Sequence, residues 1–161
     1  MIESTICLPM LGTPPNQVLL ALKKRGFGAG KITGVGGKLE AGEDAAQSAV
    51  REMAEEISIR VAVDDLCARG VIDFFFPFKP AWNMRSTLFV VEAWQGTPCE
   101  SDEVAPTFYP FDQIPFERMW ADARYWLPPI LQNQSIQARF VFGDDNETIT
   151  EWNVDIKRLG D

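Results

Sequence analysis

The most constraining feature of this chain is a glycine-led stretch over residues 37–59 that ends in a run of acidic side chains. A helix turns about 100° per residue, so Glu52, Glu55 and Glu56 lie on one face of the helix predicted there. Like charges at this spacing repel by about 0.2–0.5 kcal/mol per exposed pair. A hard divalent cation relieves the repulsion because it prefers several oxygen ligands. The pattern therefore predicts a helix that offers three carboxylates to a metal ion.

The start of this helix is also indicated locally, and we predict a helix over 43–57. Asp44 followed by Gln47 is typical of a capping box. Arg51 lies one turn before Glu55 and can brace it or reach back to Glu43. The apolar stripe of the helix consists of Ala45, Ala46, Ala49, Val50, Met53 and Ile57. Tight bending of the preceding loop is permitted by Gly34, Gly36, Gly37 and Gly42. A solvated acidic face is the alternative for a lone Glu-Glu pair, but the full spaced set favours a metal site.

The stretch resembles the Nudix box, Gly-x5-Glu-x7-Arg-Glu-U-x-Glu-Glu-x-Gly-U, where U is a bulky aliphatic residue. The matching positions are Gly37, Glu43, Arg51, Glu52, Met53, Glu55, Glu56 and Ile59. Ser58 stands where the family has glycine. Glycine there allows the helix to end in the left-handed region, so we expect Ser58 to cost about 1 kcal/mol of local strain. The departure leaves the carboxylates untouched.

Segments between about residues 18 and 132 are similar to one branch of this family, whose animal members hydrolyse oxidised purine nucleoside triphosphates such as 8-oxo-dGTP. They include 18–20, 23–30, 36–38, 95–98, 100–103, 112–116, 119–120 and 125–126. The resemblance implies one domain over residues 1–161. It also implies the α+β class: a Nudix-type α/β/α sandwich with a mixed central sheet, whose catalytic helix follows a glycine-rich loop.

The resemblance further implies the site residues. Catalysis is assigned to Glu52, Glu55, Glu56, Glu103 and Arg51, with Glu56 and Glu103 as competing candidates for the base. Ligands to Mg²⁺ or Mn²⁺ are Glu52, Glu55, Glu56, Glu103 and the backbone of Gly36. Substrate binding falls to Lys23, Phe27, Thr33, Gly37, Phe74, Met84, Trp120 and Asp122. Alternatives stay open for three of these residues: Glu103 as a surface acid, and Phe74 and Met84 as core.

Two residues depart from the branch at the positions that contact the base. Ala123 follows Asp122 where the branch has a second Asp, and Thr33 stands where the branch has Asn. A hydrogen bond in a buried site contributes about 0.5–1.5 kcal/mol, or about 1.5–3 kcal/mol when one partner is charged. Two such losses predict a selectivity for oxidised purines reduced by about one to three orders of magnitude.

Composition narrows the function classes. The net charge of −8 argues against duplex nucleic acid as a partner, whereas a basic cluster at residues 23–38 suits a single polyphosphate. The absence of histidine excludes imidazole bases and histidine metal sites. Cys7, Cys67 and Cys99 form no metal or redox motif, and we expect each to be a buried thiol in a reducing compartment. Without a secretory n-region or a run of about 20 apolar residues, we expect a cytoplasmic protein with no membrane partner.

Sequence patterns outside residues 37–59 predict the remaining strands and a second helix. We predict strands over 4–10, 17–23, 69–76, 86–94 and 108–111, and a closing hairpin of 137–142 with 148–155. A loop is predicted over 77–83. A second helix is predicted over 119–132, interrupted at Pro128 and Pro129.

The resemblance implies an Mg²⁺-dependent enzyme that cleaves oxidised purine nucleoside triphosphates to the monophosphate and pyrophosphate. Such an enzyme sanitises the nucleotide pool and so serves DNA repair. It acts as a monomer or weak homodimer. Two alternatives stay open: the same chemistry on a different nucleotide, favoured by Thr33 and Ala123, and a non-catalytic nucleotide sensor, which has no need of three metal-ligand carboxylates.

Overall fold

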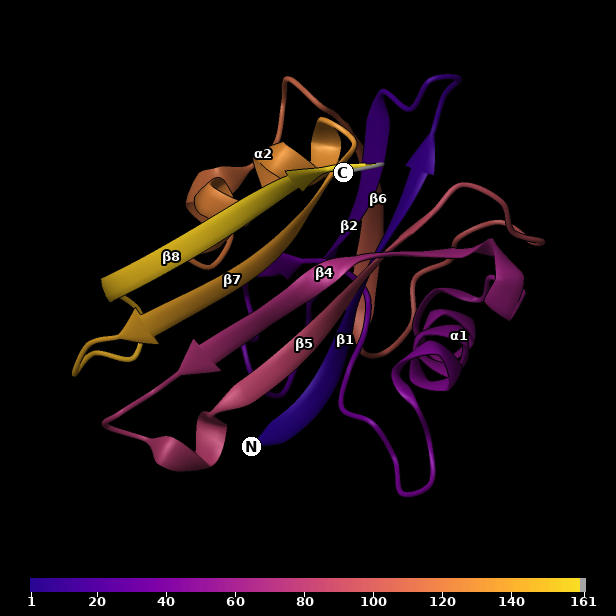
Figure 1. Ribbon diagram of the computed structural model, residues 1–161. Helices are drawn as coiled ribbons and strands as arrows, with labels where there is room; N and C mark the ends of the chain where they lie inside the picture. The colour runs from indigo at the N-terminus through magenta and orange to yellow at the C-terminus, as the bar shows by residue number, and fades with distance from the viewer. Residues whose placement is uncertain (160–161) are drawn as a thin grey trace.

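Two helices lie against opposite sides of a mixed sheet in the computed structural model, which describes residues 1–159 (Figure 1). The strands are β1 (Ile2–Leu11), β2 (Gln17–Lys23), β3 (Ile32–Thr33), β4 (Leu66–Phe75), β5 (Met84–Val91), β6 (Val104–Pro110), β7 (Gln134–Phe142) and β8 (Ile149–Arg158). The helices are α1 (Ala45–Ile57) and α2 (Ala123–Leu131), with 3₁₀ turns at Val63–Asp65, Pro80–Trp82 and Phe116–Arg118. The predicted α+β sandwich with a mixed sheet is confirmed.

The sheet runs in the order β3-β2-β1-β5-β4-β7-β8, and β6 pairs with β2. β1 is parallel to β5, and β4 is parallel to β7, while β4–β5 and β7–β8 are antiparallel. β2 meets β1 only near their shared turn, through Met10 opposite Val18 and Leu11 opposite Gln17. Beyond that turn β2 leaves β1, and residues 35–38 come to lie beside β1 instead.

Two hydrophobic cores follow from the alternation of side chains along the strands. On one face, Leu8 of β1 and Leu20 of β2 pack with α2. On the other face, Cys7 and Leu19 pack with α1, whose Met53 is fully buried. β1 and β2 therefore each contribute side chains to both cores. α1 packs against β1 next to the loop that precedes the helix.

The capping box and the end of α1 agree with the sequence prediction, whereas the helix begins at Ala45 rather than at 43. Asp44 caps the helix, and Gln47 completes the capping box in both directions. Ser58 ends the helix at φ 63°, in the left-handed region that favours glycine. The end geometry is thus retained with a serine.

The largest differences from the predicted element boundaries concern β6 and α2. β6 spans Val104–Pro110 and contains Pro106 and Pro110, whereas a strand was predicted only over 108–111. An edge strand tolerates proline because one side needs no ladder donor, and β6 pairs with β2 alone. α2 starts at Ala123 rather than at 119, and it continues through Pro128 and Pro129 because its buried face packs on the core.

The prediction of three buried thiols was wrong for two of them. Cys7 is buried between the sheet and α1. Cys67 on β4 and Cys99 in the loop before β6 are exposed. No helix within residues 1–159 is long and apolar enough to cross a membrane.

Candidate active site

A cleft of about 670 Å³ opens between the loop before α1, the N-terminal half of β1, and residues 119–123. Every site residue predicted from the sequence lines it: Lys23, Phe27, Thr33, Gly36, Gly37, Arg51, Glu52, Glu55, Glu56, Phe74, Met84, Glu103, Trp120 and Asp122. The acidic residues and the glycines form one end, which we call the carboxylate end. Phe27, Phe74, Met84, Trp120 and Asp122 form the other, which we call the aromatic end.

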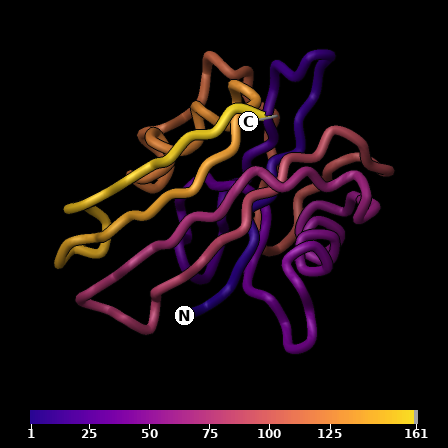
Figure 2. Tube along the Cα trace, in the orientation of Figure 1, coloured from indigo at the N-terminus to yellow at the C-terminus, as the bar shows by residue number. Residues whose placement is uncertain are grey.

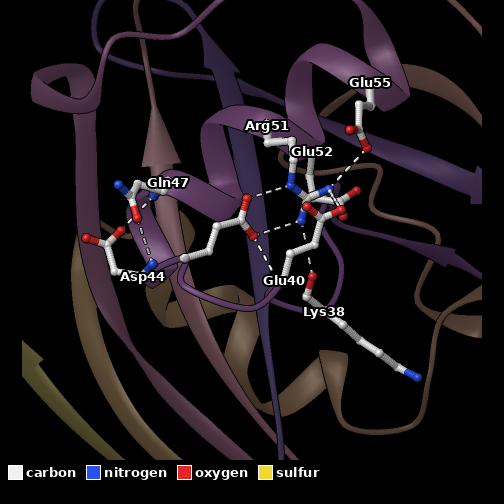
Figure 3. A network of polar contacts seen from close by, with 8 residues as sticks. Lys38, Glu40, Asp44, Gln47, Arg51, Glu52 and Glu55 are labelled. Atoms are coloured by element: carbon white, nitrogen blue, oxygen red, sulfur yellow. Dashed lines mark hydrogen bonds and ion pairs between the residues drawn. The ribbon is translucent and has the colours of Figure 1, made fainter.

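Arg51 organises the carboxylate end. Its guanidinium donates to both oxygens of Glu43, through Nε at 2.6 Å and Nη2 at 3.0 Å. Its Nη1 donates to Glu52 at 3.0 Å and to Glu55 at 3.1 Å, so one cation holds the loop and two helix carboxylates (Figure 3). Nη2 also donates to the Lys38 carbonyl. The prediction that Arg51 braces Glu55 or reaches back to Glu43 is confirmed for both partners.

This guanidinium sets the protonation of its neighbours. Hydrogen bonds from Arg51 hold the pKa of the Glu43 carboxyl at about 2. The same bonds raise the pKa of Arg51 above its ordinary value. The pair therefore stays charged over the whole physiological range and fixes the loop to the helix.

The glycine loop packs against β1 and α1 too closely for side chains. Thr5 donates its backbone N–H to the carbonyl of Gly37, at 3.0 Å. Gly36 has φ 154°, and a Cβ there would lie 2.0 Å from the Thr5 carbonyl oxygen. A Cβ on Gly37 would lie 2.7 Å from Glu52 Oε1. The glycines thus let bare backbone and the Glu52 carboxylate share one corner of the cleft.

Glu56 is the buried member of the acidic set, with only 7% of its surface exposed. Burial, and then the neighbouring Glu52 carboxylate, raise the pKa of Glu56 to about 9. The positive charge of Lys23 acts in the opposite direction. A carboxyl in this position is stabilised in its charged form by any cation that enters the cleft.

The donor set suits a hard cation such as Mg²⁺ or Mn²⁺, since all of its side-chain groups are carboxylates. Within residues 1–159, no three acidic, cysteine or histidine side chains stand close enough to hold a metal ion without moving. Arg51 engages Glu52 and Glu55, and Glu55 is mostly exposed. Joint coordination by Glu52, Glu55 and Glu56 therefore requires rotation of Glu55 away from Arg51.

Glu103 reaches the cleft from the loop before β6. Its carboxylate accepts two hydrogen bonds from Arg25, through Nε at 3.1 Å and Nη2 at 2.8 Å. It remains about half exposed, and its charge raises the pKa of Glu56 slightly. Glu103 is therefore both a cleft residue and part of a surface ion pair, in agreement with both alternatives considered from the sequence.

At the aromatic end, Phe27 and Trp120 are stacked, with ring centroids 5.4 Å apart and planes 17° apart. Lys31 Nζ lies 4.9 Å from the Trp120 ring centre and 3.3 Å from Glu147. Phe74 and Met84 are half-buried at the cleft wall. Phe74 also packs against the core, with its ring centroid 6.1 Å from that of Phe140, so it is both a cleft residue and a core residue.

Asp122 stands at the N-cap position of α2, without a side-chain capping hydrogen bond, and is almost fully buried. Its carboxylate accepts a hydrogen bond of 2.7 Å from Trp126 Nε1. Burial raises the pKa of Asp122 to about 6, while the Trp126 hydrogen bond and the charge of Lys31 oppose the rise. Ala123, next to it, also lines the cleft and places only a methyl group there.

Comparison with known proteins identifies the family. Residues 4–129 match the model of the NUDIX domain, which is more than half of the chain. The chain belongs to the NUDIX family.

Among its relatives, an oxidized purine nucleoside triphosphate hydrolase of Mus musculus is 41% identical over 140 residues, covering 87% of each chain. A hydrolase of the same name from Danio rerio is 39% identical over 155 residues, covering 96% of this chain and 97% of the relative. The structure of a MutT protein from Bacillus halodurans superposes with a TM-score of 0.80 at 23% identity, over 96% of this chain and 98% of that one. That last likeness concerns the fold.

Sequence analysis missed several residues of this NUDIX cleft. The hydroxyls of Ser4 on β1 and Ser86 on β5 are hydrogen-bonded at 2.7 Å within it. Thr5 Oγ1 is buried without a partner beside Gly36. Adjacent polar residues at the start of an otherwise apolar strand were the available signal. Trp126 was missed because its role as donor to Asp122 depends on the position of α2.

Proposed function

We propose that this NUDIX protein hydrolyses oxidised purine nucleoside triphosphates, with Mg²⁺ or Mn²⁺, to the nucleoside monophosphate and pyrophosphate. The observation that carries the proposal is the continuity of the two ends: one cleft joins a carboxylate-and-glycine corner to an aromatic pocket. A nucleoside triphosphate has the same polarity, a polyanion at one end and a flat base at the other. Removal of oxidised nucleotides from the pool would protect DNA.

At the carboxylate end, we assign the metal ion to Glu52, Glu55 and Glu56, with Glu103 and the Gly36 backbone beside them. A bound divalent cation supplies charge neutralisation for phosphate oxygens and lowers the pKa of water. Arg51 keeps the loop docked on α1 through Glu43. Glu56 and Glu103 are the two carboxylates available to accept the proton of the attacking water.

Lys23 supports the same assignment. Its side chain lines the cleft, and its charge acts on Glu56. A primary ammonium in the cleft suits a phosphate or the base edge. Gly37 adds backbone that a phosphate can approach closely.

At the aromatic end, we assign the base to Trp120, Phe27, Phe74 and Met84, with Asp122 and Thr33 at its edge. Flat apolar side chains provide stacking, which contributes about 1–3 kcal/mol per base. Asp122 provides a buried carboxyl, held by Trp126, that can distinguish base edges by a further hydrogen bond. The names of the murine and zebrafish relatives support oxidised purines as the class.

A different base is the second candidate, and Ala123 favours it. The cleft has a methyl group beside Asp122 where the related branch has a second carboxyl. An altered donor and acceptor pattern selects a different base edge. The chemistry at the carboxylate end is the same for both candidates.

The test is a steady-state assay with a panel of nucleotides: 8-oxo-dGTP, 2-hydroxy-dATP, and the four ordinary deoxynucleoside triphosphates. We expect metal-dependent release of pyrophosphate rather than phosphate, with the highest kcat/KM for an oxidised purine. A matched control is Glu117→Gln, an exposed carboxylate outside the cleft, which should behave as wild type. Binding without pyrophosphate release for every nucleotide would instead identify a sensor. Turnover with the highest kcat/KM for an ordinary nucleotide would assign a different base.

We place this activity in the cytoplasm. Cys7, Cys67 and Cys99 are all free thiols in the structure, which supports a reducing compartment. The net charge of −8 supports a free nucleotide rather than polymeric nucleic acid as the ligand.

A further inference from the structure

β8 is the outermost strand of the sheet and pairs with β7 alone (Figure 2). It is ten residues long, Ile149–Arg158, and its residues are mostly exposed. A long exposed edge presents a row of free backbone donors and acceptors, which natural proteins usually interrupt or cover. No strand or helix within residues 1–159 pairs with the outer edge of β8.

The same strand carries uncovered apolar surface. Trp152 is 52% exposed and Ile156 is 51% exposed, on the face where Val154 packs toward the core. Trp152 stacks on Tyr125 of α2 at 4.3 Å, so its ring is held in place rather than free. Two ordered apolar side chains thus flank Val154 at the edge of the sheet.

We propose that this edge pairs with the β8 of a second copy of the chain, antiparallel and centred on Val154, to form a weak homodimer. The twofold axis is perpendicular to the sheet and passes beside Val154, so Val154 faces Val154 of the second copy. Every other residue i of β8 then faces residue 308 − i of the second copy. Side chains on one face of β8 then meet only side chains of that same face. The two sheets become one continuous sheet.

The sequence of β8 is self-complementary in this register. Glu151 falls opposite Lys157 of the second copy, and the pair occurs twice by symmetry. Trp152 falls opposite Ile156, again twice, on either side of Val154 opposite itself. Opposite charges and aromatic–aliphatic pairs each stabilise neighbouring strands when directly opposed.

The neighbouring symmetric registers lack this match. Centring on Asn153 places Glu151 opposite Asp155, which sets two like charges against each other. Centring on Asp155 places Trp152 opposite Arg158 and leaves Glu151 opposite an apolar residue. Register is set by such patterns wherever one face is apolar. Val154 is therefore the preferred centre.

A second copy is favoured over an unrelated partner because the complementarity lies within the strand itself. The interface is small, because it comprises two edge strands, and each copy carries a net charge of −8. Small interfaces are typically transient. We therefore expect a dissociation constant of about 10 µM to 1 mM, within the range of weak association.

Sedimentation velocity between about 10 µM and 1 mM protein tests the proposal over that range. We expect the wild type to shift from monomer toward dimer as concentration rises. Glu151→Lys and Lys157→Glu should each weaken dimerisation about tenfold or more, because each sets like charges opposite each other twice. Combining both changes in one chain should restore the wild-type constant. Asp64→Lys is the matched control, an exposed charge reversal away from β8, and should dimerise as wild type.

An equimolar mixture of the Glu151→Lys and Lys157→Glu proteins gives the most specific result. In this register both cross-pairs become Lys opposite Glu, so the mixture should form heterodimers, detectable by native mass spectrometry, although neither protein dimerises well alone. Urea unfolding of each variant establishes that it is folded. A wild type that stays monomeric throughout, single variants that dimerise as the wild type does, or a mixture without heterodimers would each overturn the proposal.

Discussion

The carboxylate end of the cleft comes from one loop and one helix that follow each other in the chain, whereas the aromatic end collects side chains from segments that lie far apart. Residues 36–56 supply almost all of the first, with Arg51 tying Glu43 to α1. Phe27, Phe74, Met84 and Trp120 come from four different segments. One end is therefore encoded locally, and the other exists only after the sheet has formed.

This difference bears on how each end can vary. The spacing of Glu52, Glu55 and Glu56 is fixed by helix geometry, so a single substitution there removes one of the proposed metal ligands without an alternative. At the aromatic end, Thr33 and Ala123 depart from the related branch while the pocket itself persists. We infer that the chemistry is held constant at one end and that the base preference is adjusted at the other. Four measurements test this division.

The largest effect is expected from Glu56→Gln. The amide keeps the shape of the buried side chain but removes a negative ligand from the metal face. We expect kcat to fall by about a thousandfold or more, which corresponds to about 4 kcal/mol of barrier, while the protein remains folded by thermal unfolding. Glu117→Gln, in the same assay, should keep its activity. A Glu56→Gln protein with more than about a tenth of the wild-type kcat, a barrier change below about 1.4 kcal/mol, contradicts the assignment.

A second test asks whether solvent is excluded from Asp122 at the aromatic end. The pKa of Asp122 is raised from 3.8 to about 6, first by burial. The folded protein therefore holds this proton more tightly than the unfolded chain, so the stabilising contribution is complete below about pH 4 and is lost as pH rises through about 6. Two pKa units correspond to about 3 kcal/mol of unfolding free energy.

Asp122→Asn removes this titration. Urea unfolding at a series of pH values should show the wild type losing up to about 3 kcal/mol between about pH 4 and pH 7 relative to the variant. Asp64→Asn, an exposed residue, should follow the wild-type profile. Parallel pH profiles for wild type and Asp122→Asn would mean that Asp122 is solvated.

The sequence predicted the locally encoded end closely. The capping box, the bonds from Arg51 to Glu43 and Glu55, and the left-handed Ser58 all follow from spacing within one loop and helix. The continuation of α2 through Pro128 was not predictable, because packing against the core outweighs the missing backbone donor.

Contacts that depend on tertiary structure could not be predicted from the sequence either. The resemblance supplied the aromatic residues, but periodicity alone could not separate Phe74 as a cleft residue from Phe74 as core. The Trp126 bond to Asp122 and the Ser4–Ser86 pair required the packed sheet and α2. The exposed thiols of Cys67 and Cys99 were mispredicted because cysteine is usually buried, and their positions lie at the sheet surface and in a loop.

Trp120→Ala measures the affinity supplied by the aromatic end. Loss of base stacking should weaken substrate binding by about 1–3 kcal/mol, which raises KM roughly 5- to 150-fold, with a smaller change in kcat. Trp94→Ala is the matched control, a half-buried Trp stacked on Phe108 in the other core. It should lower thermal stability and leave KM unchanged. If Trp120→Ala keeps the wild-type KM and instead loses about 3–5 kcal/mol of stability, Trp120 is a core residue.

The smallest effect is expected from Thr33→Asn combined with Ala123→Asp, which tests whether these two positions adjust base selectivity. Thr33 and Ala123 both line the cleft, so we expect the new polar groups to reach the base edge. Selectivity is a difference of transition-state affinities. If each restored hydrogen bond contributes about 0.5–1 kcal/mol, the ratio of kcat/KM for 8-oxo-dGTP over dGTP should rise about tenfold. Ala123 is nearly fully buried, so the added carboxyl also carries a stability cost, which unfolding measurements on each single variant will show. A ratio that stays unchanged while both substrates are still hydrolysed would locate selectivity elsewhere in the cleft, and with it the division of roles between the two ends would fail.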